Sequence, residues 1–442
     1  MFELRRNVGR GTESEAPAPA EETPPKHPQK PYPVVKSSVN RGISSLGRAE
    51  GEAVARVLVV GGGIAGAAAA LALDRAGLDV EVFEAHPHAA EDIGAFLTLA
   101  SNGMRALREI GATEAVTAIG FPLRSIRLLE STGAQAAHAP MGEAADPALN
   151  FRCLRRGEFA VALQQEVVRR GIPVRYGARL THVEEQPGAV TAHFADGATA
   201  TGDLLLGADG LNSVVRQTVA PDAQPAYAGQ YVFYGYTTDA RPAAETDCFT
   251  MVRGSETAFG FACSPDGETY WFARVGGDPL TAERIAEETP AGWRELLVPL
   301  LRKDDTPAAD MVAATPDQLM VTNATELPVG MPWRSGRTLV LGDAAHAASP
   351  ATGQGASMAL EDAVVLAKCL RDLPDTDAAL ARYESLRRPR VEHNIVASGA
   401  MSRGTYNATD ANGRPVGKTR PGDDTLAQLL DWEADITDFP TE

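Results

Sequence analysis

The chain has 442 residues, which is more than one simple hydrophobic core usually serves and enough for two domains. Its composition, 44% hydrophobic and 22% charged, is that of an ordinary globular protein. The net charge of −17 and the absence of a basic stripe argue against a nucleic-acid partner, although a small anionic ligand needs only local positive potential. No apolar run reaches membrane-spanning length, and the first residues contain no secretion-signal core.

The four cysteines bear on the cellular compartment. Cys153, Cys248, Cys263 and Cys369 are far apart and match neither a metal-binding spacing nor a redox CxxC pair. We therefore expect reduced thiols, no bound metal and a cytoplasmic protein that has neither a membrane nor a nucleic acid as partner. The sequence leaves open whether the protein is a monomer or a homodimer.

The predicted elements begin after a tail. Residues 1–53 are rich in Pro, Glu and Lys and lack apolar periodicity, so we expect them to be disordered. RVLVV, residues 56–60, predicts a buried strand, and GGGIAG follows it. An Ala- and Leu-rich stretch to Ala76 predicts a helix that Gly77 ends, and DVEVFEA, residues 79–85, predicts the next strand. This order begins a doubly wound parallel sheet.

Two further helices are predicted over MRALREIG, residues 104–111, and EFAVALQQEVVRRG, residues 158–171. From about residue 224 to 275 the pattern changes to short aromatic-rich segments: QYVFYGYTT, CFTMVRG, AFGFACS and TYWFARV. They predict antiparallel strands of a second sheet, and SIRLLEST at 125–132 is a candidate further strand of it. After residue 337 the strand, loop and helix pattern returns.

These patterns predict an α/β protein. A Rossmann-like nucleotide-binding domain with a parallel sheet is interrupted by a mainly antiparallel substrate domain and followed by C-terminal helices. The predicted pieces of the nucleotide-binding domain are 54–124, 149–223 and 333–398. The predicted substrate domain is 224–332, with 125–148 as candidate additional strands. Residues 399–442 are predicted to be a polar C-terminal tail, in which LAQLLDW is a candidate short helix.

The first motif is Gly61-x-Gly63-x-x-Gly66, between a predicted strand and a predicted helix, with Glu84 ending the next strand. This is the full dinucleotide-binding pattern. Gly61 permits the tight turn, Gly63 lets the backbone approach a pyrophosphate, and Gly66 lets the helix pack on the strand. The helix N-terminus offers free N–H groups to the phosphates, and Glu84 can accept hydrogen bonds from ribose hydroxyls.

The second motif is LLLGADGLNSVVR, residues 204–216, in which a predicted buried strand ends in Asp209 and a tight turn. An acid, a tight turn and an arginine, here Arg216, at the carboxyl end of a strand suit a nucleotide crevice. An ordinary surface turn with a charge pair is the alternative.

The third motif is LVLGDAAHAASPATGQGASMALEDA, residues 339–363. Asp343 directly follows a predicted strand, where it can reach a sugar hydroxyl. Gly353 and Gly355 have no side chains, so the backbone can lie close against a flat ligand. A helix that begins near Gly355 directs the positive end of its dipole to the same place, which would stabilise a ligand that becomes anionic on reduction.

Together the three motifs resemble those of the FAD-dependent aromatic hydroxylases, the single-component flavoprotein monooxygenases of the para-hydroxybenzoate and salicylate hydroxylase type. The resemblance covers about residues 55–395. The motifs occur in the order GxGxxG, then the DG motif at Asp209-Gly210, then the GD motif at Gly342-Asp343. WRSGRTLVLGDAAHAASPATGQGASMALEDA is especially similar to the salicylate hydroxylase-like branch. One departure is Ala85, since many members have Arg directly after the ribose-binding Glu; it bears on one adenine-side contact and not on FAD binding itself.

The resemblance implies a set of FAD-binding residues. Those for the ADP half are Gly61, Gly63, Ile64, Ala65, Gly66 and Glu84. The residues implied to contact the flavin half of FAD, or both FAD and NAD(P)H, are Arg156, Asp209, Arg216, Asp343, Pro350, Gly353, Gly355 and Ala356. In this scheme Arg156, ahead of a helix, contacts the flavin nucleotide, Asp343 binds the ribityl chain, and Pro350 lies beside the flavin ring.

The resemblance also implies the reaction. NAD(P)H reduces FAD, O2 adds to form a flavin C4a-hydroperoxide, and the distal oxygen passes to an electron-rich substrate with loss of water. The expected product is a hydroxylated aromatic or polycyclic small molecule of secondary metabolism or aromatic catabolism, and epoxidation stays open on the same scaffold. The protein's task is to position the substrate, exclude water and prevent release of peroxide.

The aromatic insert supplies candidate substrate-pocket residues. The candidates from the insert are Tyr234, Tyr236, Arg253 and Tyr270, and Pro350 of the third motif is a further candidate. Plain sheet packing is the alternative for the tyrosines and for Trp271. No acid/base pair emerges, so no catalytic residue is assigned, and His346 is expected to be structural or to lie beside the flavin.

Other classes of function stay open. A flavin-dependent halogenase has a related fold, but its Trp-x-Trp-x-Ile-Pro signature is absent. A disulfide reductase is disfavoured, since no second GxGxxG and no redox CxxxxC occurs. A flavin-dependent oxidase and a non-catalytic flavin- or ligand-binding protein are the remaining alternatives; intact flavin-face loops argue against the latter.

Overall fold

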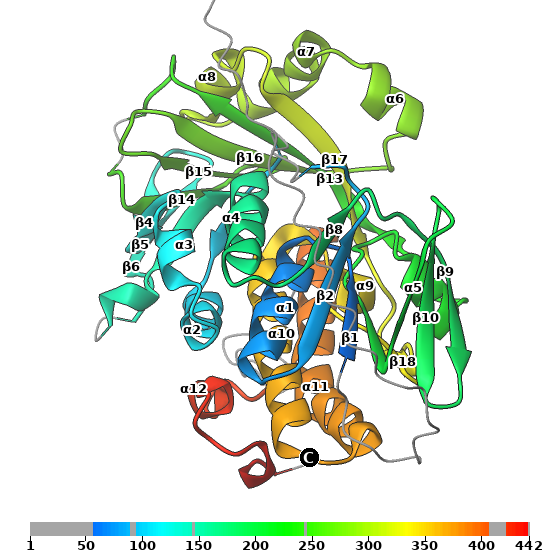
Figure 1. The fold of residues 1–442 in the computed structure, drawn as a ribbon. Helices are drawn as coiled ribbons and strands as arrows, with labels where there is room; N and C mark the ends of the chain where they lie inside the picture. Colours follow the sequence, from blue (N-terminus) through cyan, green and yellow to red (C-terminus); the bar gives the residue numbers. More distant parts are fainter. Residues whose placement is uncertain (1–55, 89–93, 144–145, 243–244, 406–420, 441–442) are drawn as a thin grey trace, which may run out of the picture. The chain divides into compact units, whose positions relative to one another are not determined.

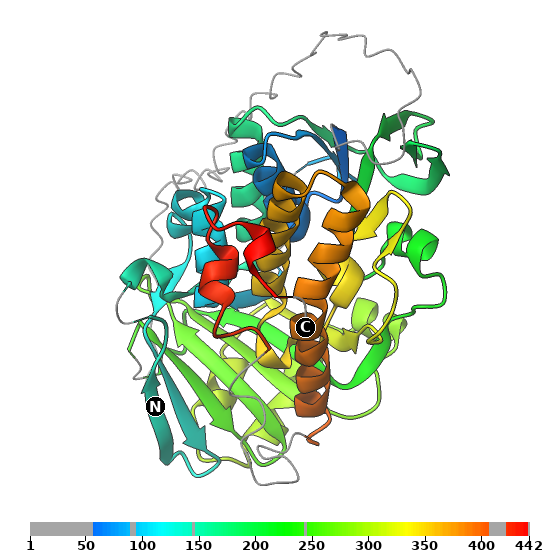
Figure 2. The same ribbon diagram turned by 90° about the horizontal axis from the view of Figure 1, so that it is seen from below.

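The computed structural model describes residues 56–88, 94–143, 146–242, 245–405 and 421–440. The tail predicted at 1–53 lies outside these residues. The described chain forms a six-stranded sheet, a seven-stranded sheet and two three-stranded sheets (Figures 1 and 2). The predicted combination of a parallel sheet with a mainly antiparallel one is confirmed.

The six-stranded sheet has the order β18-β19-β12-β1-β2-β8. Its strands are β1 (Arg56–Val60), β2 (Asp79–Glu84), β8 (Val174–Tyr176), β12 (Leu204–Gly207), β18 (Arg334–Ser335) and β19 (Thr338–Val340). β1 runs parallel to β2 and β12, β12 to β19 and β2 to β8, while β18 is antiparallel at the edge. Val57, Leu58 and Val59 are fully buried, as expected for a parallel strand covered on both faces.

Long helices pack around this sheet. They are α1 (Ile64–Arg75), α2 (Ser101–Glu109), α4 (Arg156–Arg169), α10 (Gly355–Asp372) and α11 (Thr376–Ser402). α1 lies against α10 and α4, and α10 also contacts α2 and α11 (Figure 1). Close approach of α1 is possible because its buried face is mostly alanine, from Ala67 to Ala72.

The seven-stranded sheet has the order β17-β13-β16-β15-β14-β5-β6. Its strands are β5 (Ser125–Glu130), β6 (Gln135–Pro140), β13 (Ala226–Thr237), β14 (Cys248–Arg253), β15 (Thr257–Cys263), β16 (Thr269–Gly276) and β17 (Leu319–Glu326). The four aromatic-rich segments are strands β13 to β16, as predicted. SIRLLEST forms β5, which joins β14 in parallel while the four aromatic strands pair antiparallel.

The two faces of the seven-stranded sheet have different coverings because side chains alternate along each strand. On one face α7 (Pro290–Leu301) and α8 (Ala308–Ala313) pack on a core that includes Trp271 and Phe259. The other face packs on a three-stranded sheet of β3 (Phe96–Leu99), β7 (Phe151–Arg155) and β4 (Phe121–Leu123). We call this second face, with its tyrosines and phenylalanines, the aromatic face.

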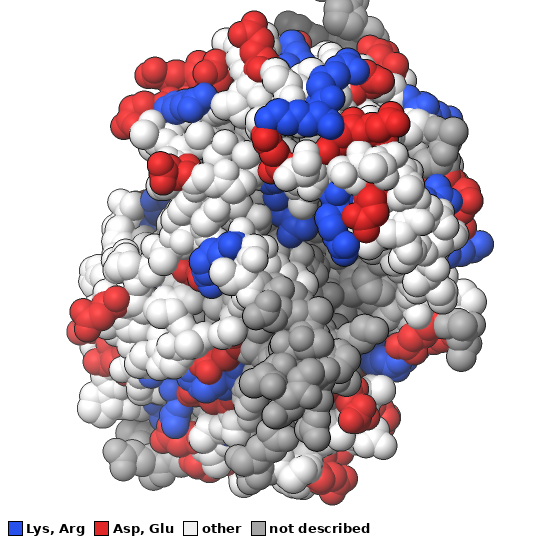
Figure 3. Space-filling view, turned by 180° about the vertical axis from the view of Figure 1, so that it is seen from behind, with Lys and Arg blue, Asp and Glu red and all other residues white. Residues whose placement is uncertain are grey.

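Shorter elements complete the described chain. They are α3 (Thr113–Thr117), η1 (Pro147–Leu149), β9 (Leu180–Gln186), β10 (Ala189–Phe194), β11 (Thr199–Gly202), α5 (Val214–Val219), α6 (Ala282–Glu287), α9 (Asp343–His346), η2 (Pro350–Thr352), α12 (Leu426–Leu430) and η3 (Ile436–Asp438). None of the helices within the described residues combines the length and apolar character needed to cross a membrane. On the face shown in Figure 3, acidic and basic side chains are mixed.

The C-terminal segment packs more closely than its polar composition predicts. LAQLLDW does contain a short helix, α12, and Leu429, Leu430 and Trp432 join the same hydrophobic core as β1 and α1. Lys368 Nζ donates hydrogen bonds to the carbonyl oxygens of Leu429, at 2.8 Å, and Asp431. The described residues 421–440 therefore pack onto this core, because a few well-spaced apolar side chains are enough to fix them.

Replacing Leu430 by alanine is expected to lower the free energy of unfolding by about 2–5 kcal/mol, because Leu430 is fully buried and the change leaves a cavity. Urea denaturation followed by tryptophan fluorescence measures this. Val396→Ala is the control, since Val396 is 58% exposed and should change stability by less than about 0.5 kcal/mol. Equal midpoints for the two variants would show that the segment does not stabilise the domain.

Candidate active site

The three sequence motifs converge because their strands are neighbours. β1, β12 and β19 lie side by side and run in the same direction, so their carboxyl ends open at one edge of the sheet. The segments that follow these strands contain Gly61, Asp209 and Asp343. In open α/β sheets this edge is where nucleotides bind.

The glycine loop after β1 has the geometry of a phosphate cradle. Gly61 has φ of +99°, and a Cβ there would lie 2.4 Å from the carbonyl oxygen of Ala208. A Cβ on Gly66 would lie 1.8 Å from the carbonyl oxygen of Gly61. A Cβ on Gly63 would meet nothing within 4 Å, so this side of the loop is open where a ligand would approach. No side chain caps α1, which leaves its first N–H groups, from Ile64 onward, for an anion.

Glu84 lies beside this loop at the end of β2 and is buried. Its Oε2 accepts a hydrogen bond from Gly62 N at 2.7 Å, and its Oε1 accepts one from His86 N at 2.8 Å. Gln164 of α4 donates to the carbonyl oxygen of Gly62 at 2.5 Å. Sequence reasoning did not identify Gln164, because a glutamine within an amphipathic helix belongs to no motif.

Asp209 and Arg216 organise the neighbouring loops. Asp209 accepts hydrogen bonds from Ser213 Oγ at 2.5 Å and from Val214 N at 2.7 Å, and so caps α5. Arg216 is buried and donates to the carbonyl oxygens of Leu211, Ala223 and Ala344. The contact with Ala344 ties Arg216 to the loop of Asp343. Direct contacts of Asp209 and Arg216 with FAD stay predictions.

The loop after β19 presents an acid and a small-residue surface. Asp343 begins α9 and is exposed, and among the described residues no hydrogen bond reaches its carboxylate. Gly355, the first residue of α10, would place a Cβ 3.9 Å from Asp343 Oδ1. Between them lie exposed Pro350 and left-handed Gly353, with φ of +65°. A carboxylate acceptor next to exposed backbone fits the ribityl and ring portions of FAD.

A buried charge network lies under this loop, and we call it the α10–α11 network. His346 Nε2 lies 2.5 Å from Asp362 Oδ2, and Arg387 donates to both Asp362 and Glu361. Arg390 also donates to Glu361. Burial raises the pKa of Asp362, but His346 and Arg387 outweigh this effect and lower it to about 2. These contacts support the structural role expected for His346.

The three tyrosine candidates lie together on the aromatic face. Tyr270 makes edge-to-face contacts with Phe96, Phe121 and Tyr236, with ring centroids 4.8–5.7 Å apart. Tyr236 donates its hydroxyl to the carbonyl oxygen of Gly94 at 2.7 Å. Burial raises the pKa of Tyr236, and raises that of Tyr234 and Tyr270 to about 12. Burial therefore favours the protonated form of all three phenols.

Two other residues of the insert lie elsewhere. Arg253 is at the exposed end of β14, where it pairs with Glu130 at 3.2 Å. Trp271 faces the helical side of the sheet and donates to Thr315 Oγ1 at 2.8 Å. The aromatic face instead contains Arg274, which sequence reasoning missed. The alternation in TYWFARV could have revealed it, because it places this arginine on the inward face with Tyr270.

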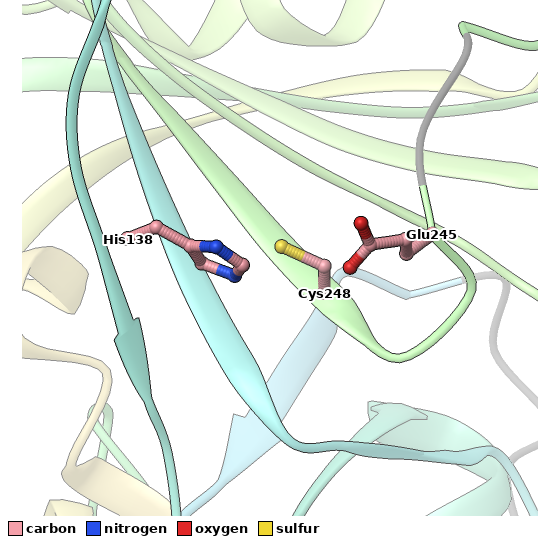
Figure 4. A group of neighbouring side chains, drawn as sticks. All are labelled: His138, Glu245 and Cys248. Atoms are coloured by element: carbon pink, nitrogen blue, oxygen red, sulfur yellow. The ribbon is translucent and has the colours of Figure 1, made fainter.

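A group of possible metal ligands lies in the seven-stranded sheet (Figure 4). Ligand atoms of His138, Glu245 and Cys248 are within 4.8 Å of one another. His138 and Glu245 are exposed, and Glu245 already pairs with Arg127 at 3.2 Å. The group belongs to β6 and to the start of β14, not to the three converging loops. We assign it no role, and the absence of a bound metal stays a prediction.

The parallel sheet with a glycine loop at its carboxyl edge defines a dinucleotide-binding fold. The model of the FAD binding domain family matches residues 54–398. The chain is 33% identical to Aurachin C monooxygenase/isomerase of Stigmatella aurantiaca, over 77% of this chain and 87% of the relative. It is 30% identical to FAD-dependent urate hydroxylase of Klebsiella pneumoniae, over 77% of this chain and 88% of that relative. The chain therefore belongs to the family of FAD-dependent monooxygenases, which confirms the resemblance.

A solved structure agrees with this assignment. Klebsiella pneumoniae HpxO complexed with FAD and uric acid superposes with a TM-score of 0.71 at 27% identity, over 86% of this chain and 93% of that one. FAD is thus the cofactor of the family fold, and the open glycine loop and the Asp343 carboxylate fit it.

Proposed function

We propose that the protein uses NAD(P)H and O2 to hydroxylate an aromatic or polycyclic small molecule held between the FAD-side loop and the aromatic face. The observation that carries this is the contact of Arg274 Nη1 on β16 with the carbonyl oxygen of Ala351, 3.4 Å away in η2. This contact brings the second sheet to the loop that would face the flavin. Relatives named 3-amino-4-hydroxybenzoate 2-monooxygenase and kynurenine 3-monooxygenase support an aromatic substrate.

Residue roles follow from the loops. The glycine loop, the α1 N-terminus and Glu84 hold the ADP half of FAD, and Asp343 accepts hydrogen bonds from the ribityl chain. Arg156, exposed at the start of α4, contacts the flavin nucleotide. Asp209 and Arg216 contribute by fixing the loops around Ala344. Pro350 to Ala356 provide the surface beside the ring.

When bound, FAD supplies the redox chemistry that links NAD(P)H and O2 to oxygen transfer. The chain's own residues bind the cofactor, orient the substrate and shield the site from water. The rings around Tyr234, Tyr236 and Tyr270 exclude water from the substrate side, which limits loss of activated oxygen as peroxide. Their ring contacts on the aromatic face support a role in packing and orienting the substrate. Epoxidation on the same scaffold stays an alternative outcome.

We divide the chain as the sequence suggested. Residues 54–124, 149–223 and 333–398 form the FAD domain, and 224–332 with the strands of 125–148 form the substrate domain. The proposal extends to a cytoplasmic enzyme, monomeric or homodimeric, since all four cysteines are free and reduced thiols suit that compartment.

Anaerobic mixing of the FAD-loaded protein with NADH or NADPH tests this function. We expect bleaching of the flavin absorbance that accelerates when a pool of phenols, aromatic acids and polycyclic compounds is present, because substrate gates reduction. The nucleotide that reduces faster identifies the physiological donor. A flavin that neither nucleotide reduces, with or without the pool, would contradict the proposal.

A further inference from the structure

Gln164 is a buried polar side chain of α4 that reaches the glycine loop. It lies among apolar buried residues of the same helix, such as Leu163 and Val167, and a buried amide is unfavourable unless it is hydrogen-bonded. Its Nε2 donates to the carbonyl oxygen of Gly62 at 2.5 Å, and its Oε1 accepts from the hydroxyl of Tyr176 at 3.2 Å. The amide is therefore held at both ends.

The orientation of this amide follows from its two partners. A carbonyl oxygen can only accept a hydrogen bond, so the amide nitrogen of Gln164 must face Gly62. The amide oxygen is then left for Tyr176, whose hydroxyl donates to it. Burial raises the pKa of Tyr176, and the nearby Glu84 adds to this effect, which favours the protonated hydroxyl that the contact needs. The N–H donor of Gln164 is thus fixed on Gly62.

Gly62 is anchored through both of its backbone polar groups. Its N–H donates to Glu84 Oε2 at 2.7 Å, and its carbonyl oxygen accepts from Gln164. The residues on either side are also glycine, Gly61 and Gly63, so no side chain restricts these peptide planes. Two buried side chains, from β2 and α4, therefore set an orientation that the sequence of the loop itself leaves open.

The anchored carbonyl decides where the next N–H points. The peptide bond between Gly62 and Gly63 is trans, and in a trans peptide the carbonyl and the following N–H point in opposite directions. Because the Gly62 carbonyl points to Gln164, the Gly63 N–H points away from α4. No atom of the described residues accepts a hydrogen bond from this N–H, and a Cβ on Gly63 would meet nothing within 4 Å. The N–H is thus open to a ligand.

We infer that Gln164 is a positioning residue for FAD, which keeps the peptide between Gly62 and Gly63 turned so that its N–H donates to the pyrophosphate. Without the Gln164 donor, this peptide can flip at little steric cost, because both flanking residues are glycine. A flipped peptide would present its carbonyl oxygen to the phosphate, and two acceptors repel each other. This inference rests on the proposed placement of the ADP half of FAD at the glycine loop, and Gln164 acts through Gly62.

Gln164→Met tests this inference, because methionine has a similar length and volume but no donor. The dissociation constant for FAD is measured by titrating the FAD-free protein and following flavin fluorescence. We expect it to rise about 10- to 100-fold, the effect of losing one hydrogen bond to a charged group. Tyr176→Phe, which leaves α4 unchanged but releases the amide oxygen, should raise it about 2- to 10-fold. This second variant carries the test if Gln164→Met does not fold.

A second readout separates positioning of the peptide from a general loss of packing. In protein made with isotope-labelled glycine, FAD should shift the amide proton of Gly63 downfield, because the N–H becomes hydrogen-bonded to phosphate. The resonance is assigned by its loss in Gly63→Ala. The shift should be absent in Gln164→Met at saturating FAD. Gln165→Met is the matched control, since Gln165 is the next residue of α4 and is exposed, and it should keep both the affinity and the shift.

Wild-type affinity for FAD in Gln164→Met, or a Gly63 shift that persists in this variant, would overturn the inference. If Gly63→Ala weakens FAD binding while Gln164→Met does not, phosphates bind at the loop and only the role of Gln164 is rejected. If neither variant weakens binding, the placement of the ADP half at this loop is wrong. A flavin that NAD(P)H never reduces rejects the proposed function instead, and that result does not depend on Gln164.

Discussion

Gly66→Ala is expected to yield a protein that retains almost no FAD and unfolds more readily. The new Cβ would lie 1.8 Å from the carbonyl oxygen of Gly61, and this neighbour is backbone, which cannot rotate away. Either α1 shifts from β1 or the loop of Gly61 opens, and each change disrupts the cradle. Overpacking of this kind costs about 1–3 kcal/mol or more.

Gly63→Ala separates ligand binding from folding. Nothing lies within 4 Å of its added Cβ, and its φ of −68° suits alanine, so we expect the stability of the FAD-free protein to be unchanged. Affinity for FAD should still fall, because the methyl group occupies the space that the pyrophosphate needs. Gly276→Ala, at the end of β16, is the control for both properties.

The measurements are bound FAD per protein after gel filtration and urea denaturation of the FAD-free forms. Normal FAD content in Gly66→Ala would show that α1 can move at no cost. Normal affinity in Gly63→Ala would show that phosphates do not bind at this loop.

The sequence allowed prediction of the features that depend on local pattern. The glycine spacing predicted the turn of Gly61 and the close packing at Gly66, because both follow from missing side chains. Short aromatic-rich segments between Gly, Pro and Asp residues predicted strands β13 to β16. Convergence of the three motifs follows from a general rule, since the carboxyl ends of neighbouring parallel strands lie at one edge of the sheet.

Features that depend on contacts between distant segments were not predictable from one sequence. Gln164 reaches Gly62 across 102 residues, and nothing near it in the sequence marks that contact. The short helix within LAQLLDW was a candidate from the sequence, but its packing was not predictable, because burial of Leu430 depends on a surface that other helices create. Arg253 was predicted as a substrate-pocket residue from its place in the insert, and only the completed sheet shows that it lies exposed at the end of β14, paired with Glu130.

Arg387→Met is expected to destabilise the protein by about 3–5 kcal/mol, because it removes the guanidinium that two buried carboxylates share. Arg387, Glu361 and Asp362 are all fully buried, and Arg387 joins the two acids. Methionine fills similar volume, so loss of charge rather than a cavity dominates. Arg388→Met is the matched control, one residue farther along α11, where partly exposed pairs with Glu384 and Glu392 contribute about 1 kcal/mol or less.

The pH dependence distinguishes the charge effect from a general loss of packing. In the wild-type protein the pKa of Asp362 is lowered to about 2, so its contribution is present above the unfolded-state pKa of 3.8 and is lost as the pH falls toward 2. In Arg387→Met, Glu361 loses the charge that most lowers its pKa and Asp362 loses the second after His346, so both pKa values should rise. As the pH falls, protonation of these two carboxyl groups removes their buried charge, so the variant loses less stability relative to the wild-type protein.

Urea denaturation at several pH values between 8 and 5 is the measurement. The difference in unfolding free energy between Arg387→Met and wild type should be largest at the alkaline end and should narrow toward the acidic end. A difference that does not vary with pH would assign the loss to packing alone. Because His346 links Asp362 to the loop of Asp343, the same variant should also bind FAD more weakly, whereas Arg388→Met, which does not touch Asp362, should bind it normally. The α10–α11 network would then hold the flavin-side loop in place as well as the fold.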